Sequence, residues 1–282
     1  MSRVLCVGTA TLDIVNRVPR YPEEDSEVRA TSQVMRMGGN AANTAIVLAQ
    51  LGDDVAWVGH LPANAEIVDS TFARHGVDAS HATRVADRFM PTSYIIASDA
   101  TGSRSIVHYR DIPEYSADDF VGVDLDDSHW VHFEGRAVDQ LGAMLRHVRR
   151  ANRITVSLEV EKPRPGIEDL FGHADLLLFS RAYAHWRGFT DAPTFLRGLP
   201  KGARATCAWG AMGAWAIDVD GSLLHAPAPV LDRVVDTVGA GDAFNAGVIH
   251  ASCAGQALAQ ALSAGVALAS LTCTQDGLAF VR

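Results

Sequence analysis

The residues best suited to chemistry lie in the decapeptide Asp236–Asn245, which reads DTVGAGDAFN. Its backbone can turn tightly just before a predicted helix, at the small residues Gly239, Ala240 and Gly241. The exposed N–H groups and the positive end of the helix dipole would form an anion site there. Asp242 lies beside that site, where a carboxylate can accept the proton of an attacking hydroxyl. These features predict phosphoryl transfer to an alcohol. For a lone Gly-x-Gly-Asp the alternative is a helix N-cap, because Asp is a favoured capping residue.

A second candidate site is the stretch MGGNAAN at Met37–Asn43, which is followed by the apolar run TAIVLAQLG. Gly39 permits close approach of the backbone to a ligand. Asn40 and Asn43 are three residues apart at a predicted helix start, so both amides can face one cleft and bond the hydroxyls of a sugar. An Asn-capped helix after a glycine turn is the alternative explanation of this stretch.

The elements that must position these motifs alternate between strand and helix patterns. Short apolar or β-branched runs predict core strands at 3–8, 55–59, 129–133, 154–158, 175–179, 204–208 and 214–218. Helical patterns lie near 39–51, 64–75, 137–150, 241–253 and 255–272. Such alternation predicts an α/β protein with a mostly parallel central sheet and helices on both faces. A chain of 282 residues suits a single domain, 1–282.

Two segments, 13–36 and 90–112, break this alternation. The first has strand-like runs around the turn-like PRYPEEDSE, and the second has two runs joined by an Asp-Ala-Thr-Gly turn. Neither is followed directly by a helix of its own. We therefore expect four strands that leave the main sheet and form a small β-sheet lid, and we interpret Tyr94 and Tyr109 as residues packed within it.

Composition and charge restrict the class of protein. Apolar residues make up 48% and charged residues 20%, which is typical of a soluble globular chain. The formal net charge is −9 and no run of Lys or Arg occurs, which argues against a nucleic-acid partner. The four cysteines have no zinc-ligand spacing. Neither a signal peptide nor a membrane-spanning apolar run is recognised, which predicts a cytoplasmic protein with no membrane partner.

Both motifs resemble signatures of one family. DTVGAGD matches the D-T-x-G-A-G-D signature of the PfkB/ribokinase carbohydrate kinases, and GGNAAN resembles their N-terminal G-G-x-x-x-N signature. The stretches LCVGTATLDIVNRVPRYPEEDSEVR, GSRSIVHYRD, WVHFEGR and VSLEVEKPR are similar to those of ketohexokinases (fructokinases). The chain is identified as a member of this family, with ketohexokinases as the most similar branch. The resemblance implies the ribokinase-like fold and an ATP-dependent sugar kinase.

The resemblance also implies which residues would bind the sugar. Its hydroxyls would be bound by Asp13, Gly39, Asn40 and Asn43. Asp25, in the lid turn, is expected to reach a sugar in its own or in the neighbouring subunit, because the lids of two ketohexokinase subunits clasp. This clasp implies a homodimer through the β lid. Without the resemblance, Asp13 is equally well explained as a turn residue.

A further set of residues is implied for ATP. Arg104 would neutralise a nucleotide phosphate, and the loop with Gly210 and Gly213 would approach the nucleotide. Residues 239–241 would hold the transferred phosphoryl group, and Asp242 would be the catalytic base. Without the resemblance, Arg104 is equally well explained as a surface residue of a hairpin.

Mg²⁺ is expected with ATP, because the metal neutralises the nucleotide phosphates. Its ligands are unknown, since the Asn-x-x-Glu element of many family members is replaced here by Phe179–Tyr183, which contains no Glu. Glu159 and Glu161 are two apart on a strand and point to one face, so they are candidate ligands or, alternatively, salt-bridged edge residues. Glu134 and Arg136 end a predicted core strand and form either part of a binding edge or a buried ion pair.

The sequence thus predicts transfer of the γ-phosphoryl group of ATP to a hydroxyl of a small sugar, a ketohexose such as fructose above all. A kinase for ribose, another small sugar or a nucleoside is an alternative, although a nucleoside site would be expected to have more aromatic residues near the lid. A catalytically inactive sugar or nucleotide sensor is the other alternative. The intact Asp242 and glycine loop argue against it.

Overall fold

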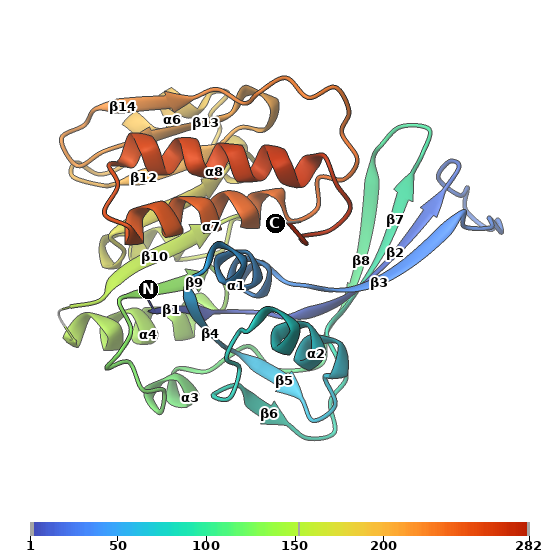
Figure 1. Ribbon diagram of the computed structural model, residues 1–282, viewed down its shortest axis with the longest axis horizontal. Coiled ribbons are helices and arrows are strands. Elements are labelled where there is room, and N and C mark those ends of the chain that lie inside the picture. The colour runs from blue at the N-terminus through green and yellow to red at the C-terminus, as the bar shows by residue number, and fades with distance from the viewer. Residues whose placement is uncertain (1–2, 152, 281–282) are drawn as a thin grey trace.

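The computed structural model describes residues 3–151 and 153–280, and strands and helices alternate along most of that length (Figure 1). Its strands are β1 (Arg3–Val7), β2 (Thr11–Val18), β3 (Ser32–Gly38), β4 (Asp54–Val58), β5 (His60–Pro62), β6 (Thr83–Val85), β7 (Thr92–Ser98), β8 (Arg104–Tyr109), β9 (Trp130–Glu134), β10 (Thr155–Val160), β11 (Leu176–Ser180), β12 (Ala205–Ala208), β13 (Ala214–Ile217) and β14 (Leu223–Ala226). Its α-helices are α1 (Asn40–Leu51), α2 (Glu66–His75), α3 (Ala117–Val121), α4 (Val138–Arg150), α5 (Arg181–Trp186), α6 (Ala192–Arg197), α7 (Ala240–Cys253) and α8 (Leu258–Cys273). Two 3₁₀ helices complete the list, η1 (Ile167–His173) and η2 (Gly210–Met212).

The main sheet has the strand order β14-β13-β12-β11-β10-β9-β1-β4. The strands from β12 to β4 are parallel, and β13 and β14 are added antiparallel at one edge. All seven predicted core strands are present within a few residues of their expected bounds, and β14 is an addition. The predicted mostly parallel sheet is therefore confirmed.

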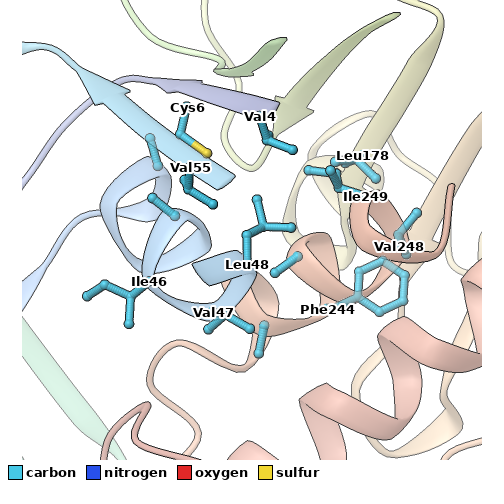
Figure 2. Packing of buried hydrophobic residues seen from close by; sticks show 14 of the residues in the cluster. Val4, Cys6, Ile46, Val47, Leu48, Val55, Leu178, Phe244, Val248 and Ile249 are labelled. Carbon is cyan, nitrogen blue, oxygen red and sulfur yellow. The ribbon is translucent and has the colours of Figure 1, made fainter. Parts of the chain in front are cut away.

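Helices cover both faces of this sheet. Apolar residues of α1, α2, α7 and α8 form one core with it, and those of α3, α4, α5 and α6 form a second core on the other face. Figure 2 shows the first core, in which Val4 of β1, Leu48 of α1 and Phe244 of α7 gather. The five predicted helices are all present, whereas the short helices α3, α5 and α6 were not predicted.

A second, smaller sheet has the order β3-β2-β7-β8 and projects from one side of the main body (Figure 1). The prediction of a separate small sheet is confirmed. Its strands run from Thr11 to Gly38 and from Thr92 to Tyr109, slightly beyond the expected first segment. Tyr94 and Tyr109 are 49% and 53% exposed, so their interpretation as packed residues was wrong.

This arrangement places the two sequence motifs opposite the open face of the small sheet. Helices α1 and α7 begin side by side and pack against each other, and each begins at a glycine motif. The carboxyl ends of β1, β9 and β10 meet at the same edge of the main sheet, where ligands bind in open parallel α/β sheets. Across one face of the small sheet, Arg36, Asp13, Ser93 and His108 form a register row.

Candidate active site

Helix α7 begins after Gly239, whose φ of 81° is a backbone conformation that side chains disfavour. Among the described residues no side chain caps this helix, so the amides of its first turn remain directed at its open end. A helix start of this kind attracts anions. Asp242 is the third residue of α7 and not its N-cap, so the capping explanation of this motif was wrong.

Asp242 is 7% exposed, and its Oδ2 accepts a hydrogen bond of 2.7 Å from Nδ2 of Asn43. Burial raises the pKa of Asp242 well above its ordinary value. The hydrogen bond from Asn43 opposes that rise in pKa, and the negative charges of Glu161, Glu134 and Asp13 add to it. Asp242 is thus a buried carboxyl with a high affinity for a proton, the property of a general base.

The start of α1 depends on Gly39, which has a φ of 101°. A Cβ at this position would clash with the backbone carbonyl of Thr9, so only glycine fits between the two chain segments. Asn40 then donates from Nδ2 to Oε2 of both Glu159 and Glu161, at 3.1 Å each. Oδ1 of Asn43 is buried without a hydrogen-bond partner among the described residues. An orphaned acceptor of this kind at a cavity wall fits a ligand hydroxyl.

Asp13 lies on β2 and is held on two sides. Oγ1 of Thr11 donates to Oδ1 of Asp13 at 2.9 Å. Its carboxylate also packs against the backbone of Gly38, where a Cβ would overlap it. Asp13 is 7% exposed, so the explanation as an ordinary turn residue does not describe it.

These residues surround a cavity of about 400 Å³ between the two sheets. We call it the polar cavity. Of the residues predicted to act in the site, it is lined by Asp13, Gly39, Asn40, Asn43, Arg104, Gly239, Gly241 and Asp242. Arg104 is exposed on β8, and its Nη1 donates to Oγ1 of Thr237 at 3.2 Å.

A second cavity of about 580 Å³ adjoins it, and Thr237, Gly241 and Phe244 line both. We call it the apolar cavity, since side chains such as Pro229, Leu231 and Val266 dominate its wall. The predicted residues Gly210, Gly213 and Ala240 line this second cavity and not the first. Asp25 lines neither cavity and is exposed in the loop between β2 and β3.

Several residues of the polar cavity were not predicted from the sequence: Thr9, Thr11, Ser93, His108 and Lys162. Thr9 directly follows the predicted core strand 3–8, a position from which its place in the cavity could have been predicted, whereas Lys162 lies four residues beyond the predicted strand 154–158. Glu134 and Arg136 also line this cavity, and they form an ion pair of 3.7 Å, so the ion-pair interpretation is confirmed and a binding role for them stays a prediction.

The polar cavity holds an excess of negative charge near Asp242. Glu159 is 5% exposed and accepts hydrogen bonds from Asn40 and from Asn245, the latter at 2.9 Å. Burial raises the pKa of Glu159 well above its ordinary value, and the charges of Asp242, Glu134 and Glu161 raise it further. A cation or a proton would relieve this repulsion.

Two carboxylates of the polar cavity suit the expected Mg²⁺. Among the described residues no group of three His, Cys, Asp or Glu side chains would hold a metal by itself. Mg²⁺ bound with a nucleotide takes only one or two carboxylates, together with phosphate oxygens and waters. Glu161 is half-exposed at the cavity and Glu159 lies beside it, so these two carboxylates fit that demand.

Comparison with known proteins gives the family of this site. Residues 1–281 match the model of the pfkB family carbohydrate kinases. The chain belongs to this family. It is a phosphotransferase with an alcohol group as acceptor.

Individual relatives agree with this pfkB-family assignment. The chain is 39% identical over 289 residues to the ketohexokinase of Mus musculus, covering 98% of this chain and 97% of that one. It is 28% identical to the ATP-dependent ribose-1-phosphate kinase of Halopiger xanaduensis, covering 98% and 94%. The ribokinase of Arabidopsis thaliana, solved with ribose and ATP, has a TM-score of 0.80 at 19% identity, covering 98% and 93%. That structural likeness establishes the ribokinase fold.

Proposed function

We propose that this kinase transfers the γ-phosphoryl group of ATP to a hydroxyl of a ketohexose such as fructose. One observation carries the proposal: the Asn43–Asp242 hydrogen bond joins the two glycine motifs in the polar cavity, next to Gly241, which lines both the polar and the apolar cavity. A sugar in the polar cavity and a nucleotide in the apolar cavity would therefore meet at Asp242. The similarity to a ketohexokinase over nearly the whole chain supports the choice of sugar.

The sugar would be bound by the polar groups of the polar cavity. Asp13 offers its remaining lone pairs, since Thr11 fixes only one of its oxygens. The orphaned Oδ1 of Asn43 would accept a hydrogen bond from a sugar hydroxyl. Among the described residues, the small sheet contributes Ser93 and His108 but no Phe, Tyr or Trp side chain to this cavity, which favours a sugar over a nucleoside.

Asp242 would act as the general base for the attacking hydroxyl. Its raised pKa gives it a strong affinity for the proton that the hydroxyl loses. Asn43 holds its carboxylate in one orientation, and the start of α7 stabilises negative charge on the transferred group.

The nucleotide would lie with its base in the apolar cavity, whose largely hydrocarbon wall suits a purine face. The loop from Gly210 to Gly213 lines that wall, and Arg104 would neutralise a phosphate. Glu159 and Glu161 would hold Mg²⁺ through its waters or directly. When bound, that ion neutralises phosphate charge as the phosphoryl group leaves.

We also propose a homodimer through the small sheet. Register aligns Met35, Ile14, Tyr94 and Val107 across the sheet face opposite to the polar cavity. Val107 is 68% exposed and Met35 is 56% exposed, and an exposed apolar row of this kind favours a protein partner. Asp25 lines neither cavity of its own chain, so its expected sugar contact would be made in the partner subunit.

A cytoplasmic location belongs to the same proposal. Cys6 and Cys207 are buried free thiols, as is usual in a reducing compartment, which also supplies ATP. In the part of the chain that the structure describes, no helix is long and apolar enough to cross a bilayer.

The experiment is an assay of ADP release from Mg·ATP with a panel of ketoses, aldoses and nucleosides. The proposal predicts the highest kcat/KM with a ketohexose. Highest turnover with ribose or a nucleoside would replace the ketohexose by that substrate. Binding of sugar and nucleotide without any turnover would mean that the protein is a catalytically inactive sensor.

A further inference from the structure

Three arginines of the small sheet bind three consecutive residues just before the glycine loop. Arg17 of β2 donates from Nη2 to the carbonyl of Val235 at 3.3 Å. Arg36 of β3 donates from Nη2 to Oδ2 of Asp236 at 2.8 Å. Arg104 of β8 donates to Oγ1 of Thr237, as described above. The small sheet is thus fastened to the segment that leads into the anion site at α7.

The Arg36–Asp236 pair is the most protected of these contacts. The side chains are 18% and 15% exposed, so solvent screens their attraction less than it would at an open surface. Arg36 also pairs with Asp276 at 3.1 Å, but Asp276 is 61% exposed and that pair is weaker. Among the three arginines, Arg36 is therefore the one most able to fix the position of the loop.

Asp236 transmits this contact to the anion site. While its Oδ2 binds Arg36, its Oδ1 accepts a hydrogen bond of 2.9 Å from the backbone N–H of Val238. Val238 and the adjacent Gly239 both line the polar cavity. The orientation of the glycine loop thus depends on a carboxylate that Arg36 holds from the opposite side.

Arg36 also connects the loop to the place where the sugar would bind. In the β2–β3 register, Arg36 lies directly opposite Asp13, and paired residues share one face of a sheet. A shift of the small sheet that brings Asp13 onto a sugar therefore moves Arg36 with it. Arg36, which contacts Asp236, and Asp13, which would contact the sugar, are thus neighbours on paired strands of the small sheet.

We propose that Arg36 is a positioning residue, which holds the glycine loop through Asp236 and couples sugar binding at Asp13 to nucleotide binding at α7. This inference rests on the proposed function for the identity of the two ligands. Coupling free energies between sites are reciprocal, so each ligand strengthens the other by the same factor. Couplings between sites commonly amount to about 5- to 150-fold in affinity, and we expect at least about 5-fold here.

The test is isothermal titration calorimetry of Mg·ADP, with and without saturating fructose, on the wild type and Arg36→Gln. In the wild type, fructose should raise the affinity for Mg·ADP about 5-fold or more. In Arg36→Gln that factor should fall below about 2-fold, while the affinity for fructose alone changes little. The variant should also lose kcat by about 10-fold, and its KM for fructose at saturating Mg·ATP should rise by about the coupling factor that is lost. Arg36→Lys keeps the charge and should recover part of both losses.

A matched control is Arg84→Gln, which removes an arginine–carboxylate pair with Asp69 outside both cavities. It should leave the coupling unchanged. Hydrogen exchange of the segment 235–241 gives a readout that needs no ligand: Arg36→Gln should speed exchange there, and Arg84→Gln should not.

The outcomes separate the inference from the proposed function. Equal coupling in wild type and Arg36→Gln, absence of coupling in the wild type, or unchanged exchange at 235–241 would each overturn the role of Arg36. Failure of the wild type to bind or phosphorylate any ketohexose would instead overturn the proposed function, while the exchange experiment would still decide whether Arg36 holds the loop.

Discussion

The hydrogen bond between Asn43 and Asp242 should affect how kcat depends on pH, and the size of the effect can be predicted. Asn43 donates to the charged form of the buried carboxyl, and so it lowers a pKa that burial raises. A hydrogen bond to a charged group is worth about 1.5–3 kcal/mol. At about 1.4 kcal/mol per unit, its loss in Asn43→Ala should raise the pKa of Asp242 by about 1–2 units.

The assay is kcat against pH at saturating sugar and Mg·ATP, because this profile reports the pKa of the base in the enzyme–substrate complex. A general base must be deprotonated, so kcat rises with pH through that pKa, and a raised pKa moves the acid limb to higher pH. The acid limb should therefore move upward by about 1–2 units in Asn43→Ala.

Asn40→Ala is the matched control, since Asn40 lies one turn earlier on α1 and donates to Glu159 and Glu161 instead. Its loss should raise the pKa of Glu159, which lessens the negative charge around Asp242. The acid limb should then stay in place or move to lower pH. An unmoved acid limb in Asn43→Ala, or an equal upward move in both variants, would show that the hydrogen bond from Asn43 does not set the pKa of Asp242.

Three further predictions concern stability and assembly. His132 is fully buried, and burial lowers its pKa from 6.5 to about 3. As the pH falls below 6.5, His132 takes up a proton in the unfolded state but not in the folded state, so the free energy of unfolding should fall by about 1.4 kcal/mol per pH unit. Urea unfolding measured against pH should lack this contribution in His132→Gln. Gly213 has a φ of 87°, and a Cβ there would strike the carbonyl of Ala226, so Gly213→Ala should cost about 1–3 kcal/mol and lower the Tm by several degrees in calorimetry. Val107→Lys places a charge on the exposed apolar row of the small sheet and should convert a dimer to a monomer in analytical ultracentrifugation, whereas a mass equal to wild type would exclude that face as the interface.

The main sheet was predictable because its strands are buried on both faces. Parallel strands of this kind are short, nearly continuous apolar runs, as β9 (WVHFE) and β11 (LLLFS) are. Strand β14 (LLHA) was missed because it is only four residues long and partly exposed at an edge. Helices α5 and α6 have six residues each, too few for a helical period to stand out.

The site was predictable where a short motif carries it and not where distant residues meet. The glycines before α1 and α7 are visible as motifs, and the roles assigned to their neighbours stay predictions. Asn40 and Glu159 are 119 residues apart, and their contact follows only from the fold, which brings the first residue of α1 to the carboxyl-terminal part of β10. Arg36 lies in an ordinary strand, and nothing in its sequence neighbours indicates that it would reach Asp236, 200 residues away.

The proposed mechanism requires Asp242 to take the proton of the attacking hydroxyl. The most direct measurement compares kcat and the dissociation constants of fructose and Mg·ATP between wild type and Asp242→Asn, which keeps the shape of the side chain. We expect kcat to fall about 10²-fold or more, the size of a lost general base, while both ligands bind within a few-fold of wild type. A kcat within about 10-fold of wild type, with binding intact, would contradict it.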